Sequence, residues 1–340
     1  MRNYIFHFLI VVIPICLFSF LFGWWAEPIY GDLTRIGKWT ERDFGRNAIQ
    51  KPIQIKSTGR SLLNPDILVL GDSFAQENIW QSVVTKETGY AVQTFDYGKN
   101  CLGNFIDAAI TNPSSKIIII ESVERTLIAR FRNIRSCVKA NVFPSEIEGG
   151  SRESIRPNWP LTLSLSYLAT TAVNTVTLNF HPEQSIKNDI VVNAPLRADC
   201  AKFSNRRNDR LLYYADDDLK QQWDPQDIQN AIANILQIQK KAEQNGKKFI
   251  FVVAPDKSSV YQSCILRDNP IHPKMSNIEN LLIASGVNTP NLYKTFADKI
   301  NVTSDLYEPD NTHWSIVGYR LAGVAVAQYI LTKEVEQGTH

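Results

Sequence analysis

The stretch Ile67-Leu-Val-Leu-Gly-Asp-Ser-Phe74 places a serine directly after a short apolar run. Four apolar residues followed by Gly-Asp predict a buried strand that ends in a tight turn. A serine in such a turn lies at the carboxyl edge of a sheet, beside a helix N-terminus whose amides can bind an oxyanion. Ser73 is therefore a candidate nucleophile, although Gly-Asp-Ser is also a common turn and helix-cap sequence.

A second motif, Asp310-Asn-Thr-His313-Trp314, lies near the far end of the chain. A serine hydroxyl needs an imidazole that accepts its proton, and the imidazole needs a carboxylate that orients it. His313 and Asp310 supply those two groups. The alternative is a histidine that only caps the helix expected to begin near Ser315. The occurrence of both motifs in one chain favours the catalytic interpretation.

Short apolar runs alternate with helix-length segments. This alternation predicts parallel β-α units that bind ligands at the carboxyl ends of the strands. The predicted strands are Ile67–Leu70, Ala91–Phe95, Lys116–Ile120 and Lys248–Ala254. Asp224 and Pro225 predict the start of one helix, which Gly246 ends, and Ile316–Leu331 is the predicted closing helix.

The N-terminus predicts a membrane anchor over residues 1–26. Tyr4–Trp25 is long enough and apolar enough to cross a bilayer, and it ends in an aromatic pair. A cleaved signal peptide is the alternative, but no Ala-x-Ala site follows the apolar run, and Phe22–Ala26 has bulky residues where a cleavage site needs small ones.

The remainder of the chain is expected to form a stalk and one domain. Residues 27–63 predict a juxtamembrane stalk packed on the domain, and residues 64–335 the domain itself. The β-α alternation breaks at about 126–223, which predicts an insertion. It is expected to form a lid or platform over the site, or else to be structural padding.

The two motifs resemble those of the SGNH (GDSL-type) hydrolases and acyltransferases, in which a Gly-Asp-Ser block precedes an Asp-x-x-His block. The resemblance implies a three-layer, flavodoxin-like α/β domain with a parallel sheet. It also implies Ser73 as the nucleophile, His313 as the base and Asp310 as the partner of the base.

Two further blocks of that family can be compared with this chain. Phe95-Asp-Tyr-Gly-Lys-Asn-Cys-Leu-Gly103 looks like the family's glycine block. It implies the amides of Ser73 and Gly98 as oxyanion donors, and Asn100 as a substrate contact. The Gly-x-Asn-Asp block is not matched, because Glu121-Ser-Val-Glu-Arg125 stands in its place. The asparagine that usually completes the oxyanion hole is therefore missing.

Other features are similar to the alginate O-acetyltransferase group of periplasmic polysaccharide-modifying proteins. They are Trp314 after the base and Val253-Ala-Pro-Asp-Lys-Ser-Ser-Val-Tyr261 after a late strand. In that group the Asp-His-Trp element precedes the serine, whereas here it follows. Asp256 and Lys257 follow the end of a predicted strand, at the edge of the sheet where ligands bind, so they are predicted substrate contacts. Trp314 is a third predicted substrate contact. A solvated loop lysine and a packed aromatic are the alternatives for the last two.

The predicted function is acyl transfer through a Ser73 acyl-enzyme. The resemblance implies a single-pass inner-membrane enzyme with a periplasmic domain that O-acetylates a cell-surface or exported polysaccharide. An O-acetyl esterase of the same fold, or a silent glycan-binding domain, is the alternative. The acyl group would come from a multi-spanning membrane acyltransferase. The sequence indicates no cofactor or metal, and its net charge of +2 predicts no nucleic-acid partner.

The cysteines are consistent with an oxidising compartment. Cys16 lies in the predicted anchor, which leaves Cys101, Cys137, Cys200 and Cys264. Four cysteines allow three pairings, and free buried thiols are the alternative.

Overall fold

The core of the protein is a sheet of four parallel strands in the order β2-β1-β3-β7. The computed structural model describes residues 2–26, 31–51, 53, 64–97, 102–134, 165–200, 203–266 and 277–338. The strands are β1 (Ile67–Gly71), β2 (Val92–Asp96), β3 (Ile117–Val123) and β7 (Lys248–Ala254). The predicted parallel-sheet α/β fold is confirmed, and each predicted strand is present.

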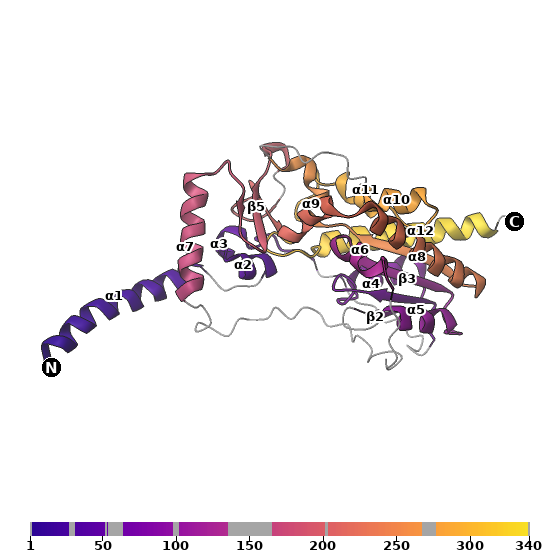
Figure 1. Ribbon diagram of the computed structural model, residues 1–340, viewed down its shortest axis with the longest axis horizontal. Helices are drawn as coiled ribbons and strands as arrows, with labels where there is room; N and C mark the ends of the chain where they lie inside the picture. Colours follow the sequence, from indigo (N-terminus) through magenta and orange to yellow (C-terminus); the bar gives the residue numbers. More distant parts are fainter. Residues whose placement is uncertain are drawn as a thin grey trace.

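Helices cover both faces of this sheet (Figure 1). Ile67 and Val69 of β1 face one hydrophobic core, and Leu68 and Leu70 face the other. Strands buried on both faces are continuously apolar, as β1 is. The first core is covered by α4 (Ile79–Thr88), α11 (Leu292–Ala297) and α12 (Ile316–Gly338). The second is covered by α5 (Leu102–Thr111), α6 (Glu124–Phe131), α8 (Pro225–Gln244) and α10 (Ile278–Ala284).

The signals that predict α8 act as expected. The Asp224 side chain accepts a hydrogen bond from the Gln226 amide at 2.7 Å, and Pro225 occupies the first helical position. Gly246, with a φ of 72°, takes a left-handed conformation just beyond the helix. These local interactions fix where the helix begins and ends.

A second, antiparallel sheet lies within the predicted insertion. It contains β4 (Ile186–Lys187), β5 (Val191–Pro195) and β6 (Arg210–Tyr214). It packs with α2 (Asp32–Gly37), α3 (Glu41–Phe44) and α7 (Leu165–Phe180) around a third hydrophobic core. The segment that follows α1 therefore shares a core with the inserted sheet. Short helices complete the fold: η1 (Ala198–Cys200), η2 (Ala215–Gln222), α9 (Lys257–Val260) and η3 (Gln262–Cys264).

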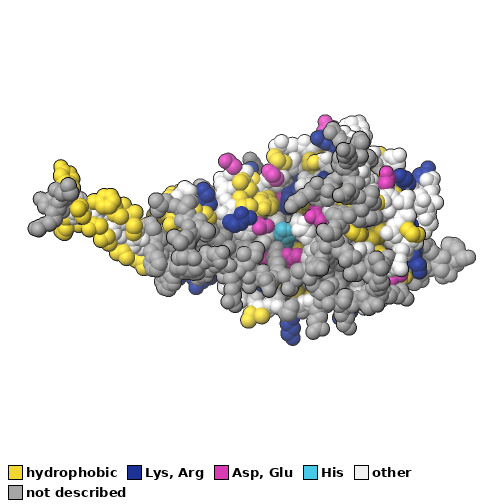
Figure 2. Space-filling view, turned by 90° about the horizontal axis from the view of Figure 1, so that it is seen from below, with side chains coloured by type: hydrophobic (Ala, Val, Ile, Leu, Met, Phe, Trp, Pro, Cys, Tyr) yellow, Lys and Arg dark blue, Asp and Glu magenta, His cyan; other side chains and the backbone are white. Residues whose placement is uncertain are grey.

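Helix α1 (Arg2–Ala26) projects from the body at the end opposite to the C-terminus (Figure 1). Figure 2 shows hydrophobic side chains along it, and Tyr4 and Phe8 are 83% and 64% exposed. The sequence predicts a membrane anchor here. Within the described part of the chain, however, no helix is both long enough and apolar enough to span a bilayer, so the predicted transmembrane helix is not supported.

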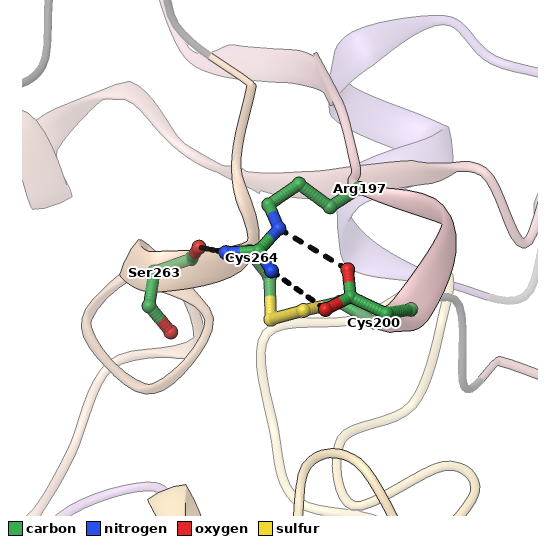
Figure 3. Close-up of a disulfide and its surroundings, with 5 residues drawn as sticks. Arg197, Cys200, Ser263 and Cys264 are labelled. Carbon is green, nitrogen blue, oxygen red and sulfur yellow. Dashed lines mark hydrogen bonds and ion pairs between the residues drawn. A yellow bond between two sulfur atoms is a disulfide. The ribbon is translucent and has the colours of Figure 1, made fainter.

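A disulfide joins Cys200 of η1 to Cys264 of η3 (Figure 3). Arg197 strengthens the same junction, since its guanidinium donates to the Ser263 carbonyl at 3.3 Å and pairs with Asp199 at 2.6 Å. The bond settles a pairing that the sequence leaves open. Cys101 and Cys137 lie outside the described residues.

Candidate active site

Ser73 lies in the turn between β1 and α4, at the carboxyl edge of the parallel sheet. It is partly exposed, whereas Phe74 beside it is buried. The turn passes very close to β3. A Cβ on Gly71 would lie 2.3 Å from Ala75 Cβ and 2.9 Å from Glu121 Oε2, so only glycine fits. The strand-to-helix turn predicted for the serine is present.

Asp72, the middle residue of Gly-Asp-Ser, fixes this turn to its neighbours. Its Oδ1 accepts from the Phe74 amide at 3.2 Å, and its Oδ2 accepts from the Val123 amide at 2.9 Å. Arg130 of α6 donates to the same Oδ2 at 2.5 Å. The Asp72 amide in turn donates to Glu121 Oε2 at 3.0 Å.

Glu121 begins the stretch that stands where the Gly-x-Asn-Asp block was expected. Its side chain is fully buried, and burial followed by the charge of Asp72 raises its pKa well above the ordinary value. The buried Glu121 side chain supports the serine turn by accepting the hydrogen bond from the Asp72 amide. Arg130 and Glu121 are site-supporting residues that sequence analysis missed, because neither lies in a motif that indicates such a role.

His313 lies against Ser73 as predicted. Its Nε2 is 3.0 Å from Ser73 Oγ, and its ring packs on Phe74 with a centroid separation of 4.8 Å. The imidazole is partly exposed, with 13% of its side chain accessible. The nucleophile and base are thus at hydrogen-bonding distance, although they are 240 residues apart in sequence.

Asn311 fixes the tautomer of the His313 ring. Its Oδ1 lies 2.8 Å from His313 Nδ1 and 3.1 Å from the His313 backbone amide. A backbone N–H can only donate, so the atom that it meets must be the amide oxygen. Nδ1 therefore carries the proton, and Nε2 presents a lone pair to the Ser73 hydroxyl. This is the tautomer that a general base requires.

The position of Asp310 corrects the sequence prediction. In the described part of the chain, Nδ1 of His313 contacts Asn311 and, at 3.8 Å, Asp32 Oδ2, and not the predicted partner Asp310. The buried Asp310 carboxyl instead lies beside the carboxyl of Glu41. Burial, and then the neighbouring Glu41, raise the pKa of Asp310 to about 8. Its carboxyl is thus largely neutral at pH 7.

Lys257 is placed where it cannot meet a substrate. Its side chain is 1% exposed, and Nζ donates to the carbonyls of Glu308 at 2.8 Å, Pro309 at 2.9 Å and Asn311 at 3.2 Å. Burial lowers the pKa of this lysine to about 7. Its ammonium form has three N–H donors for three carbonyl acceptors. Lys257 therefore supports the loop that carries His313, and its predicted role as a substrate contact is wrong.

Trp314 is also a packing residue. It is 1% exposed and lies among Phe74, Phe296 and Tyr319, with ring centroids 4.9, 5.3 and 5.4 Å away. The alternative of a packed aromatic is confirmed, and the predicted substrate contact is wrong. An indole directly after the base anchors the loop to the start of α12.

Asp256 is enclosed in a network of charged side chains. It is 1% exposed, and its two carboxylate oxygens accept from Arg125 at 2.6 Å and Lys220 at 2.7 Å. It is thus not available as the predicted substrate contact. Arg125 lies near the site, since it is 3.5 Å from Thr312 Oγ1 and stacks over the Tyr214 ring of β6.

Of the two predicted oxyanion donors, the Ser73 amide lies within the described residues. The Ser73 amide meets no hydrogen-bond acceptor among the described residues, so it can donate to a ligand. Gly98, the second predicted donor, lies outside the described residues, and so does Asn100, a predicted substrate contact.

Part of the chain matches a protein-family model. Residues 208–340 match a family model described as an SGNH hydrolase-like domain, acetyltransferase AlgX. The match confirms the resemblance seen in the motifs. It includes Lys257 and His313, and it extends neither to Ser73 nor to Asp32. Neither the curated proteins nor the solved structures contain a match to the chain.

Proposed function

We propose that this protein O-acetylates a cell-surface or exported polysaccharide through an acyl-enzyme on Ser73. One observation carries the proposal: Ser73 Oγ lies 3.0 Å from the nitrogen of His313 that the Asn311 contact leaves unprotonated. The similarity of residues 208–340 to SGNH hydrolase-like acetyltransferases supports the same type of reaction.

The first half of the reaction forms the acyl-enzyme. Ser73 Oγ attacks the carbonyl carbon of an acetyl ester, and His313 Nε2 accepts the hydroxyl proton. The bond between that carbon and the leaving oxygen breaks, and the leaving oxygen takes the proton from Nε2. The Ser73 amide stabilises the oxyanion, and Gly98 is the proposed second donor.

The second half releases the acetyl group to a sugar hydroxyl. His313 Nε2 takes the proton from that hydroxyl as its oxygen attacks the acetyl carbon. The bond to Ser73 Oγ breaks, and Oγ recovers the proton. Water could attack in the same way, which would make the enzyme an esterase. The missing third oxyanion donor slows both reactions, and a bound sugar gains effective concentration over water.

We further propose that the domain lies in the periplasm, held at the inner membrane by residues 1–26, with a multi-spanning membrane acyltransferase as its acetyl donor. The disulfide between Cys200 and Cys264 supports an oxidising compartment. Protease digestion of spheroplasts tests this location. We expect the protease to degrade the domain in spheroplasts, and the intact chain of untreated cells to stay with washed membranes. A domain protected from the protease would contradict this location.

The transferase activity is tested with the purified full chain in detergent. The chain is incubated with an activated acetyl ester, with and without an oligosaccharide of the host's surface glycan, while free acetate and acetylated sugar are both measured. We expect acetylated sugar to appear and acetate release to fall when the glycan is added, and neither product with Ser73→Ala. Acetate release that no glycan changes would instead indicate an esterase, and the absence of both products a binding domain.

A further inference from the structure

We infer that Asp32 is the charged partner of His313. It is a positioning residue, because it acts on the reacting atoms only through the imidazole. Its role would be to stabilise the imidazolium that exists while His313 holds the proton of Ser73. The inference rests on the proposed function, in which His313 is the general base, and it assigns the acid to a segment outside the predicted domain.

Asn311 and Asp32 both lie near Nδ1 of His313, but they affect the ring in different ways. Asn311 fixes the tautomer, but a neutral amide supplies no charge to a protonated ring. Asp32 Oδ2 lies 3.8 Å from Nδ1, which is close enough for an ion pair with the imidazolium. An opposite charge at this distance favours the protonated form of a histidine. Arg35 lies 3.6 Å from the other oxygen of Asp32 and holds the carboxylate from its solvent side.

The start of α2 is held tightly against the histidine loop. The amides of Leu33 and Thr34 donate to the Asp310 carbonyl at 2.9 and 3.4 Å. The Gly31 amide donates to Glu41 Oε1 at 2.9 Å. A Cβ on Gly31 would lie only 2.1 Å from the Asp310 carbonyl oxygen, so this contact leaves no room for a side chain. Asp32, between these anchors, therefore has a fixed position relative to His313.

A consequence is that the site is completed from the segment that joins α1 to the α/β domain. Asp32 begins α2, the next helix after α1 in the sequence, whereas Ser73 and His313 belong to the α/β domain. Displacement of α2 would therefore remove the negative charge from His313 and leave Asn311 in place. Ser73 and the tautomer of the His313 ring would be unchanged, but the activity would be lost.

The test is an NMR titration of the His313 ring in the full chain carrying Ser73→Ala, assigned by the loss of its signal in His313→Ala. Asp32→Asn removes the charge and nearly keeps the shape, and Asp32→Glu restores the charge. Asp32→Ser is the second neutral variant should Asp32→Asn fail to fold. Asp310→Asn tests the competing acid, and Glu87→Gln removes an equal charge from the exposed end of α4.

We expect the titration midpoint to fall by about one pH unit or more in the neutral Asp32 variants, and to recover mostly in Asp32→Glu. It should move far less in Asp310→Asn and not at all in Glu87→Gln. In the Ser73 protein, the acidic limb of the pH profile for fluorophosphonate labelling should move in the same direction. An unchanged midpoint in the neutral Asp32 variants would overturn the inference. Because the ring titration requires no acetyl donor, this outcome is independent of whether the protein transfers acetyl groups.

Discussion

The carboxyl group of Asp310 is buried beside the carboxyl group of Glu41, a residue of α3, and this neighbour contributes to the raised pKa of Asp310. Two carboxyl groups can share a hydrogen bond only if one of them holds a proton. Glu41 Oε1 is already occupied by the Gly31 amide and the Thr34 hydroxyl. A proton on Asp310 therefore relieves the repulsion between the two carboxyl groups where the segment after α1 meets the histidine loop.

This pair predicts an unusual dependence of stability on pH. The pKa of Asp310 is about 8 in the folded protein, against about 3.9 for an unfolded aspartate. Between these values the folded state holds a proton that the unfolded chain has lost. The contribution of Asp310 to the free energy of unfolding is thus largest at low pH and decreases as the pH rises toward 8.

Asp310→Asn isolates this effect, because the asparagine amide stays neutral and can donate to Glu41. Urea unfolding at pH 5 and pH 8 gives the comparison. From pH 5 to pH 8, the free energy of unfolding of the wild type should decrease by at least about 1 kcal/mol more than that of the variant. Burial raises the pKa of Asp217 as well, but this group titrates in both proteins and its effect cancels. An equal decrease in the free energy of unfolding of the two proteins would contradict the proton assigned to Asp310.

Asn311→Ala should slow the reaction of Ser73. The variant removes the acceptor of the Nδ1 proton, so the ring can adopt the wrong tautomer. Hydrogen bonds to charged groups contribute about 1.5–3 kcal/mol, which corresponds to roughly 10- to 150-fold in rate. The rate of fluorophosphonate labelling at Ser73, located by mass spectrometry, is the measurement. Asn230→Ala, an exposed asparagine on α8, is the control. A variant as fast as the control would show that Asn311 does not orient the base.

Local patterns predicted the elements and the two reacting groups. The apolar run before Gly71 determines a strand and a turn, and the turn determines where Ser73 lies. The loop before α12 brings His313 to the same sheet edge. These features depend on residues close in sequence, so the motifs are sufficient to locate them.

The neighbours of the base could not be predicted in the same way. Whether Asp310 or Asn311 faces the imidazole depends on the direction of each side chain in a four-residue loop, which the order of residue types does not determine; in the structure it is Asn311 that meets the ring. The contact of Asp32 with His313 spans 281 positions and belongs to no motif. Lys257 follows a strand end, where substrate contacts are common, but its side chain turns toward the backbone of the histidine loop.

Lys257→Met should loosen the histidine loop. Methionine fills a similar volume but leaves the carbonyls of Glu308, Pro309 and Asn311 without their common donor. Buried acceptors left unsatisfied cost about 1–3 kcal/mol, so the free energy of unfolding should fall by about that amount. Labelling of Ser73 should slow as well, because the loop sets the position of His313. Lys86→Met, at an exposed position of α4, provides the control in the same urea unfolding experiment. If both variants behaved alike, the role assigned to Lys257 would be wrong.

The disulfide between Cys200 and Cys264 should stabilise the inserted sheet against the α/β domain. The two cysteines are 64 residues apart, and closing a loop of this length lowers the entropy of the unfolded chain. The chain-entropy model gives about 4 kcal/mol for such a loop, with about 2–4 kcal/mol typical of measured bonds. The double variant Cys200→Ala with Cys264→Ala should lower the free energy of unfolding by an amount in that range. Thiol reductant should destabilise the wild type and leave the double variant unchanged, because the variant has no Cys200–Cys264 bond to reduce. Equal sensitivity of the two proteins to reductant would show that another bond, and not this one, accounts for the effect.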